Sequence, residues 1–325
     1  MADNGLPREQ WLIYRGGGEP HDGVRNLPEP PPWRQLARGQ TSADRARAYQ
    51  VGPDEVNMVN IALRLRRPLL VTGKPGAGKT TLADSIAYEL KLGPVLRWPI
   101  TSRSSLADGL YSYDAIGRLH DMRVKPGEPD GDRDIGRYIR LGPLGTALLP
   151  QDLPRVLLID DLDKSDIDLP NDLLGVFEDG EFGIRELERL PEEQSEVEVY
   201  TADPSRRAPI HRGRVVCQAF PVVVITSNGE RGFAPAFLRR CLRLDLKQPT
   251  RERLAAIVAA HLGPDALDRS APLIEEFFKL ADRGSVATDQ FLNALFLVTS
   301  GEQPPDEIRK KLPDALLRPL NAPGP

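Results

Sequence analysis

Residues 73–80 constrain the fold most strongly, because they read Gly-Lys-Pro-Gly-Ala-Gly-Lys-Thr and match the G-x-x-x-x-G-K-[S/T] pattern. The preceding residues 68–72 form a short apolar run, which is typical of a buried parallel strand. After the motif, apolar side chains recur every four residues over 82–90, which predicts an amphipathic helix. A strand, a glycine-bearing turn and a helix N-terminus together gather backbone N–H groups and the positive end of a helix dipole. The segment therefore predicts a phosphate-binding loop within an α/β fold.

Each part of this loop has a predicted role in holding a nucleotide. The glycines permit positive φ values and a close approach of the backbone to phosphate oxygens. Lys79 is placed to reach the β- and γ-phosphates, and the Thr80 hydroxyl is placed to bind Mg²⁺. The predicted cofactors are therefore ATP and Mg²⁺. The predicted nucleotide-binding residues are Gly73, Pro75, Gly76, Ala77, Gly78, Lys79, Thr80 and Thr81.

Two later apolar runs end in polar side chains of the kind that phosphoryl transfer needs. Residues 156–159 lead into Asp160 and Asp161, and residues 222–225 lead into a polar cluster that includes Asn228. In a doubly wound sheet, ligand groups lie at the carboxyl ends of the strands. We therefore expect these side chains to lie beside the phosphate-binding loop.

These strand-end residues match the parts of ATP hydrolysis in order. Asp160 is predicted to hold Mg²⁺ together with Thr80. Asp161 is predicted to polarise the attacking water. Asn228 is predicted to hydrogen-bond the γ-phosphate or that water.

Two adjacent arginines, Arg239 and Arg240, follow on a helix predicted around 234–241. A positive charge that approaches the nucleotide from outside stabilises the transition state of phosphoryl transfer. We expect these arginines to act in this way, although paired arginines on a helix usually face solvent. The predicted catalytic residues are thus Asp161, Asn228, Arg239 and Arg240.

The composition divides the chain into three parts. Residues 1–50 alternate aromatic side chains with glycine and proline and show no helix or strand period. This N-terminal extension is either a strap that docks on its own core or on a partner, or a disordered arm. Residues 51–248 carry the patterns of the α/β nucleotide-binding domain. Residues 249–325 show only helical periods, which predicts a small helical domain.

Several local elements are predicted within residues 51–248. Asp54 and Asn171 are candidate N-caps of two helices, and a further helix is expected near 106–119. Residues 124–136 form a polar loop whose aspartates do not match the spacing of an EF-hand. Residues 190–213 are charged and proline-bearing, and are predicted to form a surface excursion.

Charge and cysteine usage argue against several classes of protein. The formal net charge is −4, so no direct nucleic-acid partner is predicted, and the basic cluster at 64–67 is interpreted as a solvated helix end. Cys217 and Cys241 form no ligand-spaced pair, which favours a reducing cytoplasm and disfavours structural zinc. No apolar run approaches the ~18 residues needed to cross a bilayer, and the first residues lack a signal-peptide pattern. Neither membrane insertion nor export is therefore predicted.

The order and wording of these motifs resemble AAA+ ATPases of the MoxR group. The matching stretches are 68–81, 111–115, 138–149, 156–164, 171–174, 226–228 and 236–241, within roughly residues 51–300. The resemblance implies a P-loop NTPase fold with a doubly wound, five-stranded parallel sheet of order 5-1-4-3-2, followed by a helical lid. It also implies a homo-oligomeric ring, commonly hexameric, in which an arginine of the next subunit completes each site. By motif position that arginine is Arg240, with Arg239 close behind, and Asn228 falls on the sensor-one position.

The resemblance implies a ring-forming, chaperone-like ATPase that remodels or matures a partner complex. Proteins similar to it commonly act with a partner that carries a von Willebrand factor A domain. A second hypothesis is a nucleotide-gated assembly switch in a bacterial signalling or defence system, with little turnover. A third, a small-molecule kinase, is disfavoured because kinases rarely need Asn228 on its strand or the paired arginines.

The chain departs from the family pattern at two places. The family usually has Glu where this chain has Asp161, whose side chain is one methylene shorter. A displacement of about 1 Å can lower a rate by ~10²-fold, so slow turnover is expected. In the lid, Arg283 is only a weak candidate for a second sensor, and Ser285 is interpreted as a plain helix cap.

Overall fold

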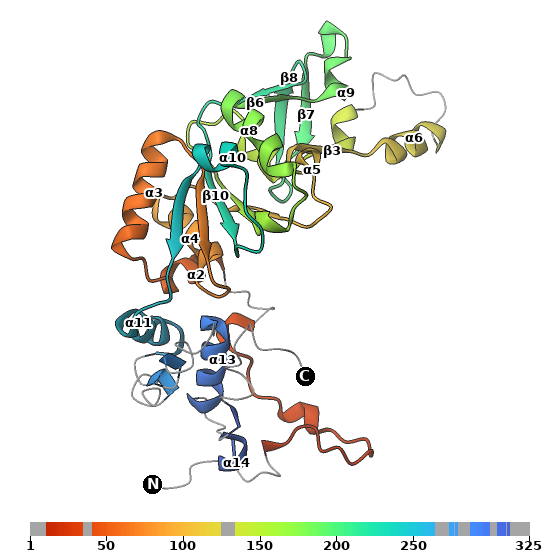
Figure 1. The fold of residues 1–325 in the computed structure, drawn as a ribbon. Coiled ribbons are helices and arrows are strands. Elements are labelled where there is room, and N and C mark those ends of the chain that lie inside the picture. Colours follow the sequence, from red (N-terminus) through yellow and green to blue (C-terminus); the bar gives the residue numbers. More distant parts are fainter. Residues whose placement is uncertain are drawn as a thin grey trace. The chain divides into compact units, whose positions relative to one another are not determined.

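The structure is a computed structural model, whose fold is shown in Figure 1. It describes residues 11–34, 41–124, 134–263, 273–275, 277–278, 287–299, 304–309 and 311–312. The chain divides into two compact units. The first comprises residues 51–73 and 79–246, and the second comprises residues 1–50, 74–78 and 247–325, so far as they are described.

The first unit is built on a five-stranded parallel sheet, sheet A. Its strands are β1 (Leu69–Gly73), β2 (Leu96–Pro99), β5 (Val156–Asp160), β10 (Val222–Ser227) and β11 (Leu242–Leu246), in the order β11-β1-β10-β5-β2. All neighbouring strands run parallel. The three apolar runs predicted from the sequence are the inner strands, whose side chains are mostly buried. The prediction of an α/β fold with a parallel central sheet is confirmed.

The strand order of sheet A can be compared with the expected order 5-1-4-3-2 once the strands are numbered in the same way. The described residues contain eleven strands, because six belong to a second sheet that the sequence analysis did not predict. The strand labels therefore differ from those of a protein with five strands. Counted within sheet A alone and in chain order, its strands stand fifth, first, fourth, third and second across the sheet.

Helices pack beside sheet A, as Figure 1 shows. α3 (Pro53–Leu65) contacts β1 and β11, and α4 (Lys79–Glu89) contacts β1, β5 and β10. α4 is the amphipathic helix predicted after the glycine-rich motif, and its Leu82 and Ile86 are buried. α8 (Leu169–Asp179) packs against α10 (Pro235–Arg240).

The two predicted helix caps are wrong. α3 begins at Pro53, and the N–H of Gly52 before it donates to Glu55 Oε2 at 3.1 Å, so Asp54 lies inside the first turn. α8 begins at Leu169, two residues before Asn171. Both helices carry proline in their first turn, where the fixed φ favours the helix and no N–H is lost. α8 ends at its C-cap Gly180, whose left-handed φ of 65° suits glycine.

A second sheet, sheet B, lies in the first unit beside α5 and α8 (Figure 1). Its strands are β3 (Tyr111–Tyr113), β4 (Ile139–Leu141), β6 (Glu181–Gly183), β7 (Glu196–Tyr200), β8 (Arg207–His211) and β9 (Arg214–Val216), in the order β3-β4-β7-β8-β9-β6. The surface excursion predicted at 190–213 is therefore wrong. β7 and β8 pair antiparallel and bury alternate side chains, which are Val197, Val199, Ala208 and Ile210.

The helix predicted near 106–119 is also wrong in part. α5 (Leu106–Leu110) ends before β3, and α6 (Ala115–Val124) begins after it. The interruption is Tyr111–Tyr113, which pairs with β4. Aromatic residues favour strands, and here pairing with a distant segment outweighs the local helical period.

Short elements complete the first unit: α7 (Pro143–Ala147), α9 (Arg185–Glu188), η4 (Ile135–Tyr138), η5 (Leu162–Lys164) and η6 (Glu192–Gln194). One hydrophobic core runs through both sheets, from Leu157 and Ile159 in sheet A to Val199 and Ile210 in sheet B. The two sheets therefore share one interior.

The second unit is helical. Its described elements are η1 (Gly23–Asn26), η2 (Pro32–Arg34), α2 (Ser42–Ala48), α11 (Arg251–Leu262), α13 (Thr288–Thr299) and α14 (Asp306–Arg309). Leu254 and Val258 of α11 share a core with Phe291 and Leu295 of α13.

The described part of the N-terminal extension docks on these helices. Trp33 donates from Nε1 to Asn293 Oδ1 at 2.9 Å, and its ring meets His261 and Phe296 edge-on. Of the two hypotheses for residues 1–50, the structure supports a strap on the chain's own helices for this segment.

Several predictions fall outside the described residues. They concern Arg283 and Ser285 of the lid, and Asp130 and Asp132 of the polar loop. Among the helices that are described, none has the length and apolar content to span a bilayer.

Candidate nucleotide-binding site

The phosphate-binding loop has the backbone conformation expected of its glycines. φ is 76° at Gly76 and 88° at Gly78, in the left-handed region that other residues rarely adopt. Both positions are also tightly packed. A Cβ at Gly76 would lie 2.8 Å from Asp289 Oδ1, and a Cβ at Gly78 would lie 2.8 Å from the ring of Tyr49. α4 begins directly afterwards at Lys79, so strand, turn and helix follow one another as predicted.

The other predicted loop residues lie on either side of this turn. Gly73 ends β1, and Pro75 and Ala77 lie within the turn. The N–H of Ala77 donates to the carbonyl oxygen of Lys74 at 3.2 Å. Thr81 lies in the first turn of α4.

The Lys79 ammonium joins β1 to the end of β10. Nζ donates to the carbonyl oxygen of Gly73 at 2.8 Å and to Asn228 Oδ1 at 2.7 Å. Burial lowers the pKa of Lys79, and the charges of Asp161, Asp163 and Asp160, in that order, oppose this shift. The amine is therefore held among three carboxylates that favour its charged form.

The two predicted metal ligands lie together. Asp160 Oδ1 accepts a hydrogen bond from Thr80 Oγ1 at 3.1 Å and another from Thr226 Oγ1 at 2.6 Å. A hydroxyl and a carboxylate oxygen are ligands that Mg²⁺ accepts, and the ion usually takes one or two carboxylates and completes its shell with phosphate and water. The donor set of Thr80 and Asp160 therefore fits Mg²⁺.

Asp161 is held on every side. Its backbone is left-handed, with φ 61° and ψ 49°, and its N–H donates to Thr226 Oγ1 at 2.8 Å. Oδ1 accepts from Asn228 Nδ2 at 3.0 Å, and Oδ2 accepts from Lys164 Nζ at 2.6 Å. This hydrogen bond raises the pKa of Lys164. The carboxylate expected to polarise water thus has a partner on each oxygen.

Asn228 is the point at which these contacts meet. Its amide oxygen accepts from Lys79 and its amide nitrogen donates to Asp161. Its backbone N–H donates to Asp163 Oδ2 at 3.0 Å, as does the N–H of Glu230. The structure therefore brings together Lys79, Thr80, Asp160, Asp161 and Asn228, as predicted.

Three members of this cluster were not predicted from the sequence. Thr226 bridges the twin acids, buried Asp163 fixes the 228–230 backbone, and Lys164 covers Asp161. The other Asp163 oxygen, Oδ1, is buried without a hydrogen-bond partner among the described residues. The signal was present, because Asp163 and Lys164 follow the twin acids directly. Only the tight turn of η5, however, brings them back towards β10.

No described hydrogen bond or ion pair joins Arg239 or Arg240 to this cluster. Arg240 instead pairs with Glu178 of α8 and donates to the Ala236 carbonyl. The Arg67 guanidinium donates to the carbonyl oxygens of both arginines at the end of α10. Arg67 therefore caps a helix, which refines its interpretation as part of a solvated helix end.

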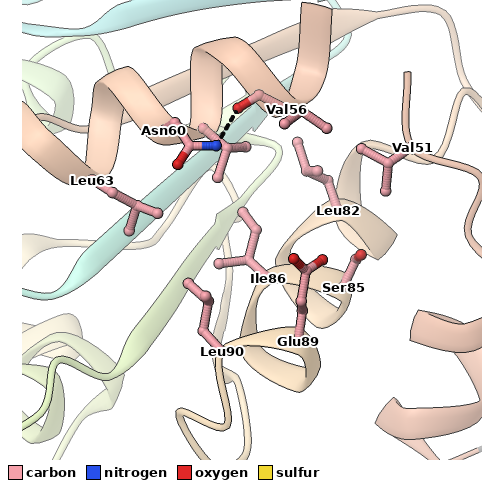
Figure 2. A pocket seen from close by; sticks show the side chains of 10 residues that line it. Val51, Val56, Asn60, Leu63, Leu82, Ser85, Ile86, Glu89 and Leu90 are labelled. Atoms are coloured by element: carbon pink, nitrogen blue, oxygen red, sulfur yellow. Dashed lines mark hydrogen bonds between the residues drawn. The ribbon is translucent and has the colours of Figure 1, made fainter. Parts of the chain in front are cut away.

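Two concavities of the first unit have other linings. A groove of about 100 Å³ is lined by Val56 and Leu63 of α3, by Leu82 and Ile86 of α4, and by Leu90 directly after α4 (Figure 2). Ligand pockets usually measure about 300–1,000 Å³, so this groove is too small for a nucleotide. A larger cavity of about 630 Å³ borders sheet B; its charged lining residues are Asp134, Glu193, Glu196, Glu198, Arg118 and Arg207. Its excess of acids is unfavourable to phosphate.

The chain was also compared with known proteins. No family model matches the chain, and no curated protein matches it.

Proposed function

We propose that the chain is a Mg²⁺-dependent ATPase of the P-loop class, similar to AAA+ ATPases of the MoxR group. The observation that carries this proposal is the hydrogen-bonded cluster at the carboxyl edge of sheet A. It joins a phosphate-loop lysine, a metal-ligand pair, a water-polarising acid and a sensor-type asparagine across as many as 149 residues of sequence. These are the groups that phosphoryl transfer to water requires. The order of sheet A, counted within the sheet, also supports an AAA+ arrangement.

Each side chain has a defined task in this proposal. The loop N–H groups and Lys79 bind the β- and γ-phosphates. Thr80 and Asp160 hold Mg²⁺, which neutralises the phosphate oxygens when it is bound. Asp161 orients the attacking water, and Asn228 fixes both Asp161 and Lys79 relative to the γ-phosphate.

The arginines act between subunits in this proposal. Arg240, with Arg239 beside it, projects from α10, whose end is fixed by Arg67. A homo-oligomeric ring, commonly hexameric, would follow. Its work would be the remodelling of a complex that includes a protein with a von Willebrand factor A domain.

The second candidate function is a nucleotide-gated assembly switch with little turnover. It is favoured by Asp161, which is short and has both oxygens engaged. In that case ATP occupancy rather than hydrolysis would control assembly. The free thiols of Cys217 and Cys241 favour a reducing compartment, such as the cytoplasm, for either function.

Phosphate release with ATP and Mg²⁺ tests the proposal. The wild type should release phosphate only when Mg²⁺ is present, and Asp160→Asn should lose most of this activity. Asp152→Asn, an exposed acid outside the cluster, is the matched control and should retain it. Mass photometry with and without ATP separates the candidates, because a switch would assemble with ATP and release no phosphate. An equal loss in both variants would contradict the proposed role of Asp160.

A further inference from the structure

Lys164 forms an ion pair with Asp161 that has no role in the proposed reaction. Its ammonium lies 2.6 Å from Asp161 Oδ2, and the pair is partly exposed, with 44% of the Lys164 side chain and 28% of the Asp161 side chain accessible. Asn228 Nδ2 occupies the other oxygen, Oδ1. Each carboxylate oxygen of Asp161 thus accepts a hydrogen bond from a side-chain donor.

The fold builds this contact into a turn. Asp161, whose backbone is left-handed, directly precedes η5, and the N–H of Lys164 donates back to the Asp161 carbonyl oxygen at 2.9 Å. Leu162, between them, is fully buried and anchors the turn. Asp163 fastens the same turn to the 228–230 backbone. Because the backbone is already fixed, little ordering is needed to place the Lys164 side chain over the carboxylate.

A covered carboxylate is a poor partner for water. The ammonium takes one acceptor position of Oδ2 and the Asn228 amide takes one of Oδ1, so an incoming water has to share either oxygen with a donor that fixes the orientation of the carboxylate. A charge-assisted hydrogen bond at this distance is among the strong ones.

We propose that Lys164 is a positioning residue that restrains ATP hydrolysis by holding Asp161 away from the attacking water. This inference rests on the proposed ATPase function. Removal of the ammonium frees Oδ2 and leaves the Asn228 contact, so Asp161 remains in place but accepts water. In this proposal Lys164 slows the chemical step of hydrolysis and leaves nucleotide binding unchanged.

The test uses single-turnover hydrolysis of saturating ATP-Mg by the full-length chain. Lys164→Met should raise the rate about threefold, because a partly exposed ion pair of this kind contributes less than one tenfold factor. Lys164→Gln should also raise it, whereas Lys164→Arg should keep the wild-type rate. The affinity for ATP should stay within about twofold in all three. Lys91→Met is the matched control, because Lys91 is exposed at the opposite end of α4.

A double variant distinguishes an effect of Lys164 through Asp161 from a general effect on the structure. In an Asp161→Asn background, Lys164→Met should no longer raise the rate. A lower or unchanged rate in both Lys164→Met and Lys164→Gln, with ATP bound normally, would contradict the role of Lys164 in restraining hydrolysis. The ATPase proposal would then still stand. If the wild type binds no ATP, the ATPase proposal is contradicted, and so is the proposed role of Lys164.

Discussion

Sheet A and sheet B share one hydrophobic core, yet they differ in almost every other respect. The inner strands of sheet A are continuous apolar runs, parallel, and end in polar side chains that meet at one edge. In sheet B, strands β4, β7, β8 and β9 alternate buried and exposed residues, and the strands pair mainly antiparallel. No hydrogen bond of the phosphate-site cluster comes from a described residue of sheet B. The comparison separates a sheet whose polar edge carries the candidate site from one that completes the interior.

The two sheets differ in where their strands can carry charged residues. A central parallel strand is covered on both faces, so its charged residues collect at its ends, as Asp160 does. An antiparallel strand can expose one face, as Glu196 and Glu198 do on β7. Changes at the polar end of a sheet A strand should therefore affect function, and changes in the sheet B interior should affect stability.

The largest effect is expected outside both sheets, at Arg240. Arg240→Ala should lower steady-state turnover by about 10³-fold, because an arginine that acts on the transition state contributes on that scale. ATP affinity should stay nearly constant. Turnover and nucleotide titration measure the two quantities, and Arg243→Ala, an exposed arginine on β11, is the control. Lost binding together with normal turnover per bound ATP would show that the role is misassigned.

A smaller change is expected at the end of β5. Asp161→Glu should raise single-turnover hydrolysis by about 10–100-fold, because the longer side chain brings the carboxylate nearer the water. Asp168→Glu, outside the cluster, is the comparison variant. An equal or slower rate in Asp161→Glu would show that the left-handed turn at Asp161 already compensates for the shorter side chain.

Sheet B should respond through stability alone. Ile210 is buried in β8, so Ile210→Ala should destabilise the first unit by about 2–4 kcal/mol. ATP affinity below the unfolding transition should not change. Denaturant unfolding and nucleotide titration test the two statements, with exposed His211→Ala of the same strand as control. A weaker affinity for ATP in folded Ile210→Ala would break the separation between the sheets.

The smallest effect concerns the helical unit, which lies outside both sheets. Burial lowers the pKa of His261, whose ring meets Trp33. Above about pH 6.5 the imidazole is neutral in both folded and unfolded chains, so it adds no pH dependence. Below that pH the unfolded chain takes up the proton more readily, so stability falls until the folded pKa is reached.

Thermal unfolding followed by tryptophan fluorescence at pH 7.5 and pH 5.5 measures this effect. His261→Gln should show a smaller loss of stability on acidification than the wild type. His211→Gln, an exposed histidine, should behave as the wild type does. An equal loss in all three chains would place the sensitive group elsewhere.

The sequence predicts sheet A well because its signals are local. The apolar runs before Asp160 and Asn228 identify strands, and the glycine pattern before Lys79 identifies the turn. β7 was not predicted as a strand because the high charge of its surroundings was interpreted as a solvated surface segment. The alternation of Val197 and Val199 with glutamates was therefore not taken as a strand pattern.

The missed site residues depend on tertiary contacts. Lys164 covers Asp161 because the left-handed backbone of Asp161 leads directly into the 3-10 turn η5, and Thr226 reaches Asp160 because β10 lies beside β5. Neither fact can be read from spacing. The helix starts at Pro53 and Leu169 show a different cause, since a proline in the first turn outweighed the polar caps.

The most direct test of the account is calorimetric titration of ATP with Mg²⁺ into wild type and Lys79→Met, with Lys91→Met as control. The account predicts one tight site per chain in the wild type and in the control. In Lys79→Met, affinity should fall about 100-fold or more, because the ammonium that links Gly73 and Asn228 also binds the phosphates. Equal affinity in all three chains, or no binding in any, would contradict it.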